Sequence, residues 1–113
     1  MHLVYVIIGT RPEAIKMAPL ILKLKKKKGL FTKVLLTGQH KDMVNEVMNI
    51  FKLKPDLNLQ IMKENQSIND ITQRILNGLQ EEFKKNKPNL ILVQGDTSTS
   101  FAAALAAFYE NIT

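Results

Sequence analysis

The sequence contains no cysteine and only two histidines among its 113 residues. Without cysteine the chain can form neither a disulfide nor a thiol nucleophile, and a structural zinc site is not expected. His2 and His40 are far apart in the sequence, so we expect no metal site built on them. The absence of cysteine is in keeping with a reducing compartment, and we expect a cytoplasmic protein.

Long apolar runs and nucleotide-binding signatures are also missing. No apolar run approaches the ~20 residues that a membrane-spanning helix needs, and the opening "MHLVYVIIG" lacks the basic lead of a signal peptide. We therefore expect no membrane partner. The P-loop pattern GxxxxGK[ST] and the dinucleotide pattern GxGxxG are absent, so the sequence supports neither hydrolysis by a P-loop nor a dinucleotide cofactor. We expect no cofactor.

What the sequence does contain is typical of one soluble domain, with 45% hydrophobic and 23% charged residues. The net charge of +6 raises nucleic acid as a possible partner. However, much of the excess lies in the lysines at 23 and 25–28, at the end of a helical pattern, where cations stabilise the helix dipole. No arginine-rich stripe interleaved with aromatic residues accompanies them, so we expect a solvated helix end and no nucleic-acid partner.

Strand and helix patterns alternate along the whole chain. Short β-branched apolar runs predict strands, and apolar residues spaced three and four apart predict helices. Pro19 lies inside the first helical pattern and predicts a kink or a split there. Ser67 and Asp70 predict a capping box, and Thr97 or Ser98 predicts the start of the last helix. The expected strands are residues 3–9, 31–38, 56–62 and 89–96, and the helices cover 12–28, 41–51, 68–85 and 98–111.

This alternation predicts an α/β fold, a Rossmann-like parallel sheet with helices on both faces. The usual strand order is 3-2-1-4, which makes the first and fourth strands neighbours. A fourth strand at an open edge would be a liability, so we expect residues 1–113 to be the N-terminal part of a larger Rossmann-like domain.

Two loops at the carboxyl ends of those neighbouring strands carry the candidate site. The first, "GTRP", places Arg11 at a helix start, where a guanidinium and free backbone amides suit phosphate. Lys16, one turn later, could add a second positive charge. The second loop, "QGDTSTS", carries Asp96, a candidate for acid–base work or for contact with a sugar hydroxyl. Purely structural roles stay open: Arg11 in an ion pair with Glu13 or Asp96, Lys16 as a solvated lysine, and Asp96 as a helix N-cap.

The loop "TGQHKD" brings Gln39 and His40 to the same end of the sheet. A histidine there could titrate near neutral pH. A hydrogen-bonded loop histidine is the alternative, and base rates for lone histidines favour it.

Four stretches together resemble the non-hydrolysing UDP-N-acetylglucosamine 2-epimerases: "GTRPEAIKMAPL", "TGQH", the "KPD.NL.IM" pattern of residues 54–62, and "VQGDTSTSFAAALAAFY". They occur in order across nearly the whole chain. The resemblance implies half of the N-terminal domain of a glycosyltransferase-B-like, two-domain fold, with the UDP-sugar between the domains. The family interconverts UDP-N-acetylglucosamine and UDP-N-acetylmannosamine by eliminating and re-adding UDP, without a cofactor or metal, to supply bacterial surface polysaccharides.

The resemblance also implies roles for individual residues. Arg11 and Lys16 match residues that contact substrate, and Asp96 matches an acidic residue of binding or catalysis, so Asp96 and Lys16 are the catalytic candidates. Gln39 matches a contact to an allosteric UDP-sugar, although Asp42 and Asn65 depart from the other two positions of that site. The rest of the first domain, with a "HVEAGLR"-like loop, and the second domain are not in this chain.

The resemblance further implies a homodimer for the full-length protein, and no activity for residues 1–113 alone. Two alternatives remain at this point: a related UDP-sugar glycosyltransferase and a stand-alone anion-binding α/β module.

Overall fold

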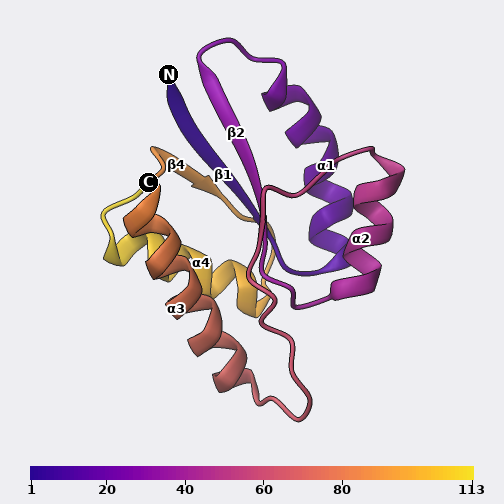
Figure 1. The fold of residues 1–113 in the computed structure, drawn as a ribbon, viewed down its shortest axis with the longest axis vertical. Helices are drawn as coiled ribbons and strands as arrows, with labels where there is room; N and C mark the ends of the chain where they lie inside the picture. The colour runs from indigo at the N-terminus through magenta and orange to yellow at the C-terminus, as the bar shows by residue number, and fades with distance from the viewer.

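The computed structural model describes residues 1–113, apart from the side chain of Lys41. Strands and helices alternate from one end of the chain to the other, as the sequence predicts (Figure 1). The elements are β1 (His2–Ile8), α1 (Arg11–Lys25), β2 (Leu30–Leu36), α2 (Lys41–Ile50), β3 (Leu57–Asn58), α3 (Ile68–Lys85), β4 (Leu90–Leu92) and α4 (Ser98–Tyr109).

The four strands form one parallel sheet in the order β3-β2-β1-β4, which confirms the predicted order. Strand β1 pairs with β2 in a register that sets His2 beside Leu30 and Ile8 beside Leu36. It pairs with β4 in a register that sets Val4 beside Leu90 and Val6 beside Leu92. Helices α1 and α2 cover one face of the sheet, and α3 and α4 cover the other (Figure 1). The predicted α/β class, with helices on both faces, is confirmed.

Strand β1 is buried on both faces because its side chains alternate between two cores. Val6 and Ile8 pack with the apolar faces of α1 and α2, whereas Tyr5 and Ile7 pack with α3 and α4. All four side chains are at most 1% exposed. Burial of one such aliphatic side chain contributes about 1.5–3 kcal/mol, so β1 holds both halves of the fold together.

Pro19 neither splits nor ends α1, which runs as one helix from Arg11 to Lys25. Of the predicted kink or split at Pro19, the split is wrong, and so is the predicted end of the helix at residue 28. A proline at this position removes the hydrogen bond to the carbonyl of Ile15, four residues earlier. Both residues are exposed, so water can satisfy that carbonyl and the helix continues.

The third strand is shorter than the predicted 56–62. Only Leu57–Asn58 has regular strand geometry, because the Asn58 side chain accepts a hydrogen bond from the Gln60 backbone (2.9 Å) and Gln60 has a φ of +53°. The chain still follows β2 beyond this turn: Leu59 N donates to Leu36 O (2.8 Å) and Ile61 N to Thr37 O (3.0 Å). The predicted strand of residues 56–62 is therefore correct as to its pairing with β2 but wrong as to an uninterrupted strand.

The fourth strand covers Leu90–Leu92 rather than 89–96. The chain leaves the sheet early because Gly95 has a φ of +85° and the Ser100 hydroxyl donates to Gln94 O at 2.6 Å. That bond folds the segment after β4 back onto the start of α4.

Both predicted helix starts on this face are confirmed. Ser67 and Asp70 exchange side-chain hydrogen bonds with each other's backbone N–H groups at 3.1 Å. Thr97, rather than Ser98, caps α4 by accepting from Ser100 N at 3.2 Å. The alanines of α4 lie in the same buried cluster as Ile75 and Leu79 of α3, so their small side chains pack against α3.

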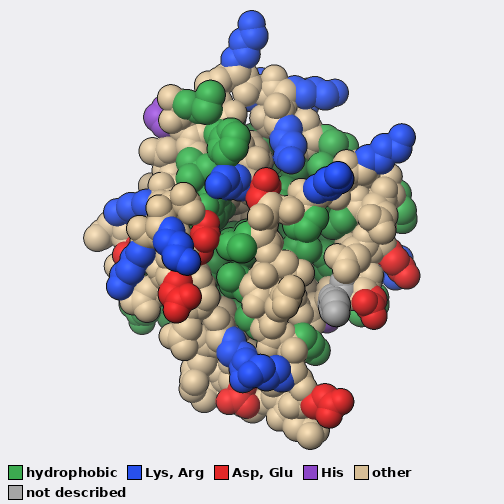
Figure 2. All heavy atoms as spheres, viewed as in Figure 1, with side chains coloured by type: hydrophobic (Ala, Val, Ile, Leu, Met, Phe, Trp, Pro, Cys, Tyr) green, Lys and Arg blue, Asp and Glu red, His purple; other side chains and the backbone are tan. Residues whose placement is uncertain are grey.

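Within the described residues, no helix is both long enough and apolar enough to cross a membrane. On the face shown in Figure 2, lysine and arginine side chains are interspersed with acidic ones and do not form one continuous basic surface.

Candidate functional site

The carboxyl ends of β1, β2 and β4 meet at one edge of the parallel sheet, which we call the strand-end edge. Backbone hydrogen bonds join the loops there: Thr37 N donates to Ile8 O (3.0 Å), and His40 N donates to Gly9 O (2.9 Å). The loop after β2 is therefore fastened to the loop after β1. Ligands of open α/β sheets bind at this edge.

Glu13 occupies the backbone amides at the start of α1. Its carboxylate accepts from Gly9 N (3.3 Å), Thr10 N (3.1 Å) and the Thr10 hydroxyl. The side chain is only 1% exposed. The expectation that these amides are free for a phosphate is therefore wrong. The sequence indicates this use of the amides, because "TRPE" has the Thr-x-x-Glu spacing of a capping box. An anion bound at the β1–α1 loop therefore cannot rely on the amides of Gly9 and Thr10 and depends on side chains there.

His40 is a hydrogen-bonded loop histidine, the alternative that base rates favour. Besides its backbone bond to Gly9, its Nδ1 accepts from Arg11 N at 3.4 Å. His40 therefore joins the loop after β2 to the start of α1.

The three predicted substrate-binding side chains are all exposed: Arg11 at the first residue of α1, Lys16 in its second turn, and Asp96 between β4 and α4. No hydrogen bond or ion pair among the described side chains joins any two of them. The strand order brings the loops of Arg11 and Asp96 to adjacent positions at the strand-end edge. Lys16 lies on α1, further from that edge along the chain.

Two of the purely structural roles considered for Arg11 and Asp96 do not occur in the structure. Glu13 binds the backbone before α1, so it is not the ion-pair partner of Arg11. Thr97 caps α4, so Asp96 is not its N-cap. Arg11 and Asp96 therefore have exposed charged groups that the local fold does not use.

Gln39 takes part in a hydrogen-bonded circuit that sequence reasoning missed. Gln39 N donates to the Thr37 hydroxyl (3.4 Å), the hydroxyls of Thr37 and Thr99 lie 3.0 Å apart, and the Thr99 hydroxyl donates to Gln39 Oε1 (2.7 Å). We call these three residues the amide circuit. Thr37 and Thr99 are both fully buried. Threonine is common near the ends of strands, so the sequence alone gives no sign of the amide circuit. The circuit becomes visible only when the structure brings the loop after β2 next to α4.

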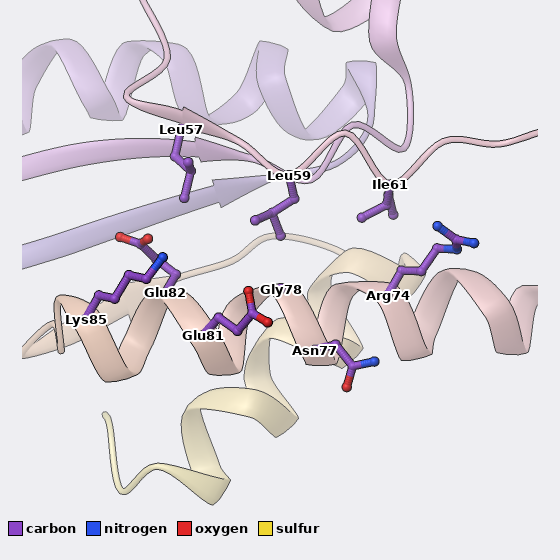
Figure 3. A pocket seen from close by; sticks show the side chains of 9 residues that line it. All are labelled: Leu57, Leu59, Ile61, Arg74, Asn77, Gly78, Glu81, Glu82 and Lys85. Atoms are coloured by element: carbon purple, nitrogen blue, oxygen red, sulfur yellow. The ribbon is translucent and has the colours of Figure 1, made fainter.

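One cavity among the described residues lies away from the strand-end edge. It measures about 400 Å³ and is situated between α3 and the segment that contains β3. Figure 3 shows Leu57, Leu59 and Ile61 pointing from that segment toward α3, where Arg74 and Glu81 line the opposite side. None of the predicted site residues lines this cavity, so it is not the predicted site. Within the described residues, no three acidic or histidine side chains are grouped so that they could hold a metal ion.

Comparison with known proteins assigns the chain to a family. Residues 22–113 match the family model described as UDP-N-acetylglucosamine 2-epimerase. The Bacillus subtilis UDP-N-acetylglucosamine 2-epimerase is 51% identical over 109 residues, which is 96% of this chain and 29% of that protein. The chain belongs to the UDP-N-acetylglucosamine 2-epimerase family.

Solved structures of the family have the same fold. The Neisseria meningitidis UDP-N-acetylglucosamine 2-epimerase, bound to UDP-N-acetylglucosamine, aligns with a TM-score of 0.90 and 49% identity over 97% of this chain. The Methanocaldococcus jannaschii enzyme, in complex with UDP-N-acetylglucosamine and UDP, aligns with a TM-score of 0.90 at 32% identity. This chain covers 30% of each of those two chains. The resemblance stated from the sequence motifs is thus confirmed for the family and for the fold.

Proposed function

We propose that this chain is the N-terminal part of an enzyme that interconverts UDP-N-acetylglucosamine and UDP-N-acetylmannosamine. Membership of the epimerase family carries this proposal, and the neighbour structure that contains UDP-N-acetylglucosamine supports it. The chain matches about 30% of the length of those relatives. Residues 1–113 would form part of a Rossmann-like first domain, and the remainder of the enzyme would form the rest of that domain and a second one.

In the proposed reaction, a base removes the proton from C2 of the sugar while the bond between C1 and the diphosphate oxygen breaks. The electrons of the C–H bond form a C1=C2 double bond, and those of the C1–O bond go to UDP. The product, 2-acetamidoglucal, then takes back UDP at C1 and a proton at C2 on its other face. Atoms and electrons balance with no external oxidant or reductant.

The exposed groups at the strand-end edge suit this chemistry. Negative charge develops on the diphosphate as the C1–O bond breaks, and nearby cations stabilise it. Arg11 can offer two parallel N–H donors to phosphate oxygens, and Lys16 a further positive charge. Because Glu13 already occupies the amides of Gly9 and Thr10, these two side chains carry the anion recognition of this loop. Asp96 is assigned to proton transfer or to a sugar hydroxyl.

The setting of the enzyme follows from the same proposal. We assign it to the cytoplasm, where nucleotide sugars are made, to the supply of precursors for bacterial surface polysaccharides, and to a homodimer. Gln39 is assigned to a UDP-sugar contact, with the allosteric subsite as its place.

The test is an assay of the full-length gene product for formation of UDP-N-acetylmannosamine from UDP-N-acetylglucosamine. We expect turnover by that protein and none by residues 1–113 alone. If the full-length product is folded and binds UDP but forms no UDP-N-acetylmannosamine, the epimerase assignment is wrong. Transfer of the sugar to an acceptor would indicate the glycosyltransferase alternative.

A further inference from the structure

The amide circuit has a fixed direction. A backbone N–H can only donate, so the bond from Gln39 N makes the Thr37 oxygen an acceptor. The Thr99 hydroxyl donates its single proton to Gln39 Oε1 at 2.7 Å. In the 3.0 Å contact between the two threonines, Thr37 must therefore be the donor. Each hydroxyl accepts one hydrogen bond and donates one, and the circuit closes on the same glutamine from which it starts.

This direction determines which end of the Gln39 carboxamide stays available. The oxygen is used by Thr99, so the Nε2 amino group, a donor only, is the end that remains for another partner. If the carboxamide were turned over, its amino group would donate to Thr99 and the Thr99 hydroxyl would donate to Thr37. The Thr37 hydroxyl would then have no acceptor for its own proton within the circuit. The two threonines are completely buried and Gln39 is half-buried, so water does not readily substitute for any member of the circuit.

Gly9, which directly follows β1, makes room for the circuit because it has no side chain. A Cβ atom placed on Gly9 would lie 1.9 Å from Thr99 Oγ1 and 3.0 Å from Gln39 Oε1. The carboxamide therefore lies next to Gly9, at the start of the loop that contains Thr10 and Arg11. Thr99 is not needed to cap α4, because Thr97 does so. Its buried hydroxyl accepts from Thr37 and donates to Gln39, so it links the two residues of the β2–α2 loop.

We propose that Thr99 is a positioning residue that orients the Gln39 carboxamide, so that Nε2 donates a hydrogen bond to an acceptor oxygen of the UDP-sugar. This inference rests on the proposed function, because it assigns a positioning residue to the contact between Gln39 and a UDP-sugar that is proposed there. Thr99 does not touch the ligand and acts only through Gln39. Thr37 completes the circuit and supports the same orientation.

The experiment measures UDP-N-acetylglucosamine binding and steady-state kinetics of the full-length enzyme with three substitutions. Thr99→Val removes the hydroxyl at nearly constant shape, Thr99→Ser retains the hydroxyl and is the matched control, and Gln39→Leu removes the proposed contact. We expect Thr99→Val to raise the Kd or the half-saturating concentration about 10-fold, the loss of one well-placed hydrogen bond. For Thr99→Ser, which keeps the hydroxyl, the Kd should remain within about twofold of the wild-type value. A twofold change in Kd corresponds to a small difference in binding free energy.

The double substitution Thr99→Val with Gln39→Leu separates positioning from general damage. If Thr99 acts only through Gln39, the double variant binds no more weakly than Gln39→Leu alone. Additive losses, an equal loss in Thr99→Ser, or wild-type binding by Thr99→Val would each overturn the proposal. Should Thr99→Val fail to fold, Thr99→Ala removes the same hydroxyl and takes its place.

The outcomes also distinguish this proposal from the proposed function. A wild-type enzyme that neither binds nor epimerises UDP-N-acetylglucosamine would refute the function itself. An active wild type with a Thr99→Val variant that binds normally would refute the positioning of Gln39 alone.

Discussion

Gly9 and Thr99 approach each other so closely that position 9, directly after β1, has no room for a side chain: a Cβ on Gly9 would lie 1.9 Å from Thr99 Oγ1 and 2.5 Å from Thr99 Cβ. The two residues are 90 positions apart in the sequence. Their contact joins the β1–α1 loop to the first turn of α4 at the strand-end edge.

Gly9→Ala is therefore expected to destabilise the protein. Overpacking of a buried site typically costs about 1–3 kcal/mol, and a 1.9 Å contact with a rigid β-branched side chain belongs at the upper end or beyond. Chemical denaturation measures the loss. The matched variant is Gly9→Ala with Thr99→Gly, which removes the side chain that the new methyl group meets. This double variant should recover part of the loss; additive effects would show that the contact with Thr99 is not the cause.

Glu13→Ala is expected to lower the free energy of unfolding by about 1–3 kcal/mol, because Gly9 N and Thr10 N lose a buried acceptor. Glu46→Ala on α2 removes a carboxylate from an exposed position and should cost at most about 0.5 kcal/mol. Urea denaturation of both variants checks the difference. Equal losses would mean that Glu13 does not hold the start of α1.

The strand-end loops illustrate what the sequence could and could not predict. The alternation of apolar runs and helical patterns was enough for the parallel sheet, its strand order and the positions of Arg11 and Asp96, because each depends on local periodicity and on general rules of α/β topology. The use of the helix-start amides by Glu13 was predictable in principle from "TRPE", but the phosphate interpretation competed for the same groups.

Other features depend on contacts between distant segments. The hydroxyl of Thr99 meets Gln39 only after β2 and α4 have been brought together, and no local pattern distinguishes Thr99 from the other hydroxyl residues of "TSTS". The early end of β3 depends on one side chain, that of Asn58, which turns the backbone at Gln60. The passage of α1 through Pro19 depends on the exposure of that side of the helix.

Tyr5 provides a pH-dependent test of the packing between β1 and α3. Its hydroxyl donates to Glu82 Oε1 at 2.6 Å, and burial, followed by the hydrogen bond and charge of Glu82, raises the pKa of Tyr5 well above its ordinary value of 10.0. The unfolded chain would release this proton near pH 10, whereas the folded protein retains it to higher pH. The contribution of Tyr5 is therefore complete below pH 10 and is lost as the pH rises above 10 toward the folded pKa.

Tyr5→Phe removes this contribution and serves as the comparison. At pH 7 we expect it to lower the free energy of unfolding by about 0.5–1.5 kcal/mol, the usual net value of one hydrogen bond. The difference between wild type and Tyr5→Phe should shrink as the pH is raised above 10, as followed by urea denaturation at each pH. A difference that stays constant would contradict the raised pKa.

The central claim is that Arg11 and Asp96, at the ends of neighbouring strands, line a UDP-sugar site. The direct measurement is the rate of UDP-N-acetylmannosamine formation by the full-length enzyme with Arg11→Ala or Asp96→Asn, beside Lys23→Ala, which removes an exposed cation of the same helix α1. We predict that both site variants lose at least about 100-fold in kcat/KM, in the range of a lost transition-state contact or proton transfer, with unfolding free energies within about 0.5 kcal/mol of wild type. Lys23→Ala should retain wild-type activity. Wild-type turnover in both Arg11→Ala and Asp96→Asn would contradict the assignment of the site to the strand-end edge.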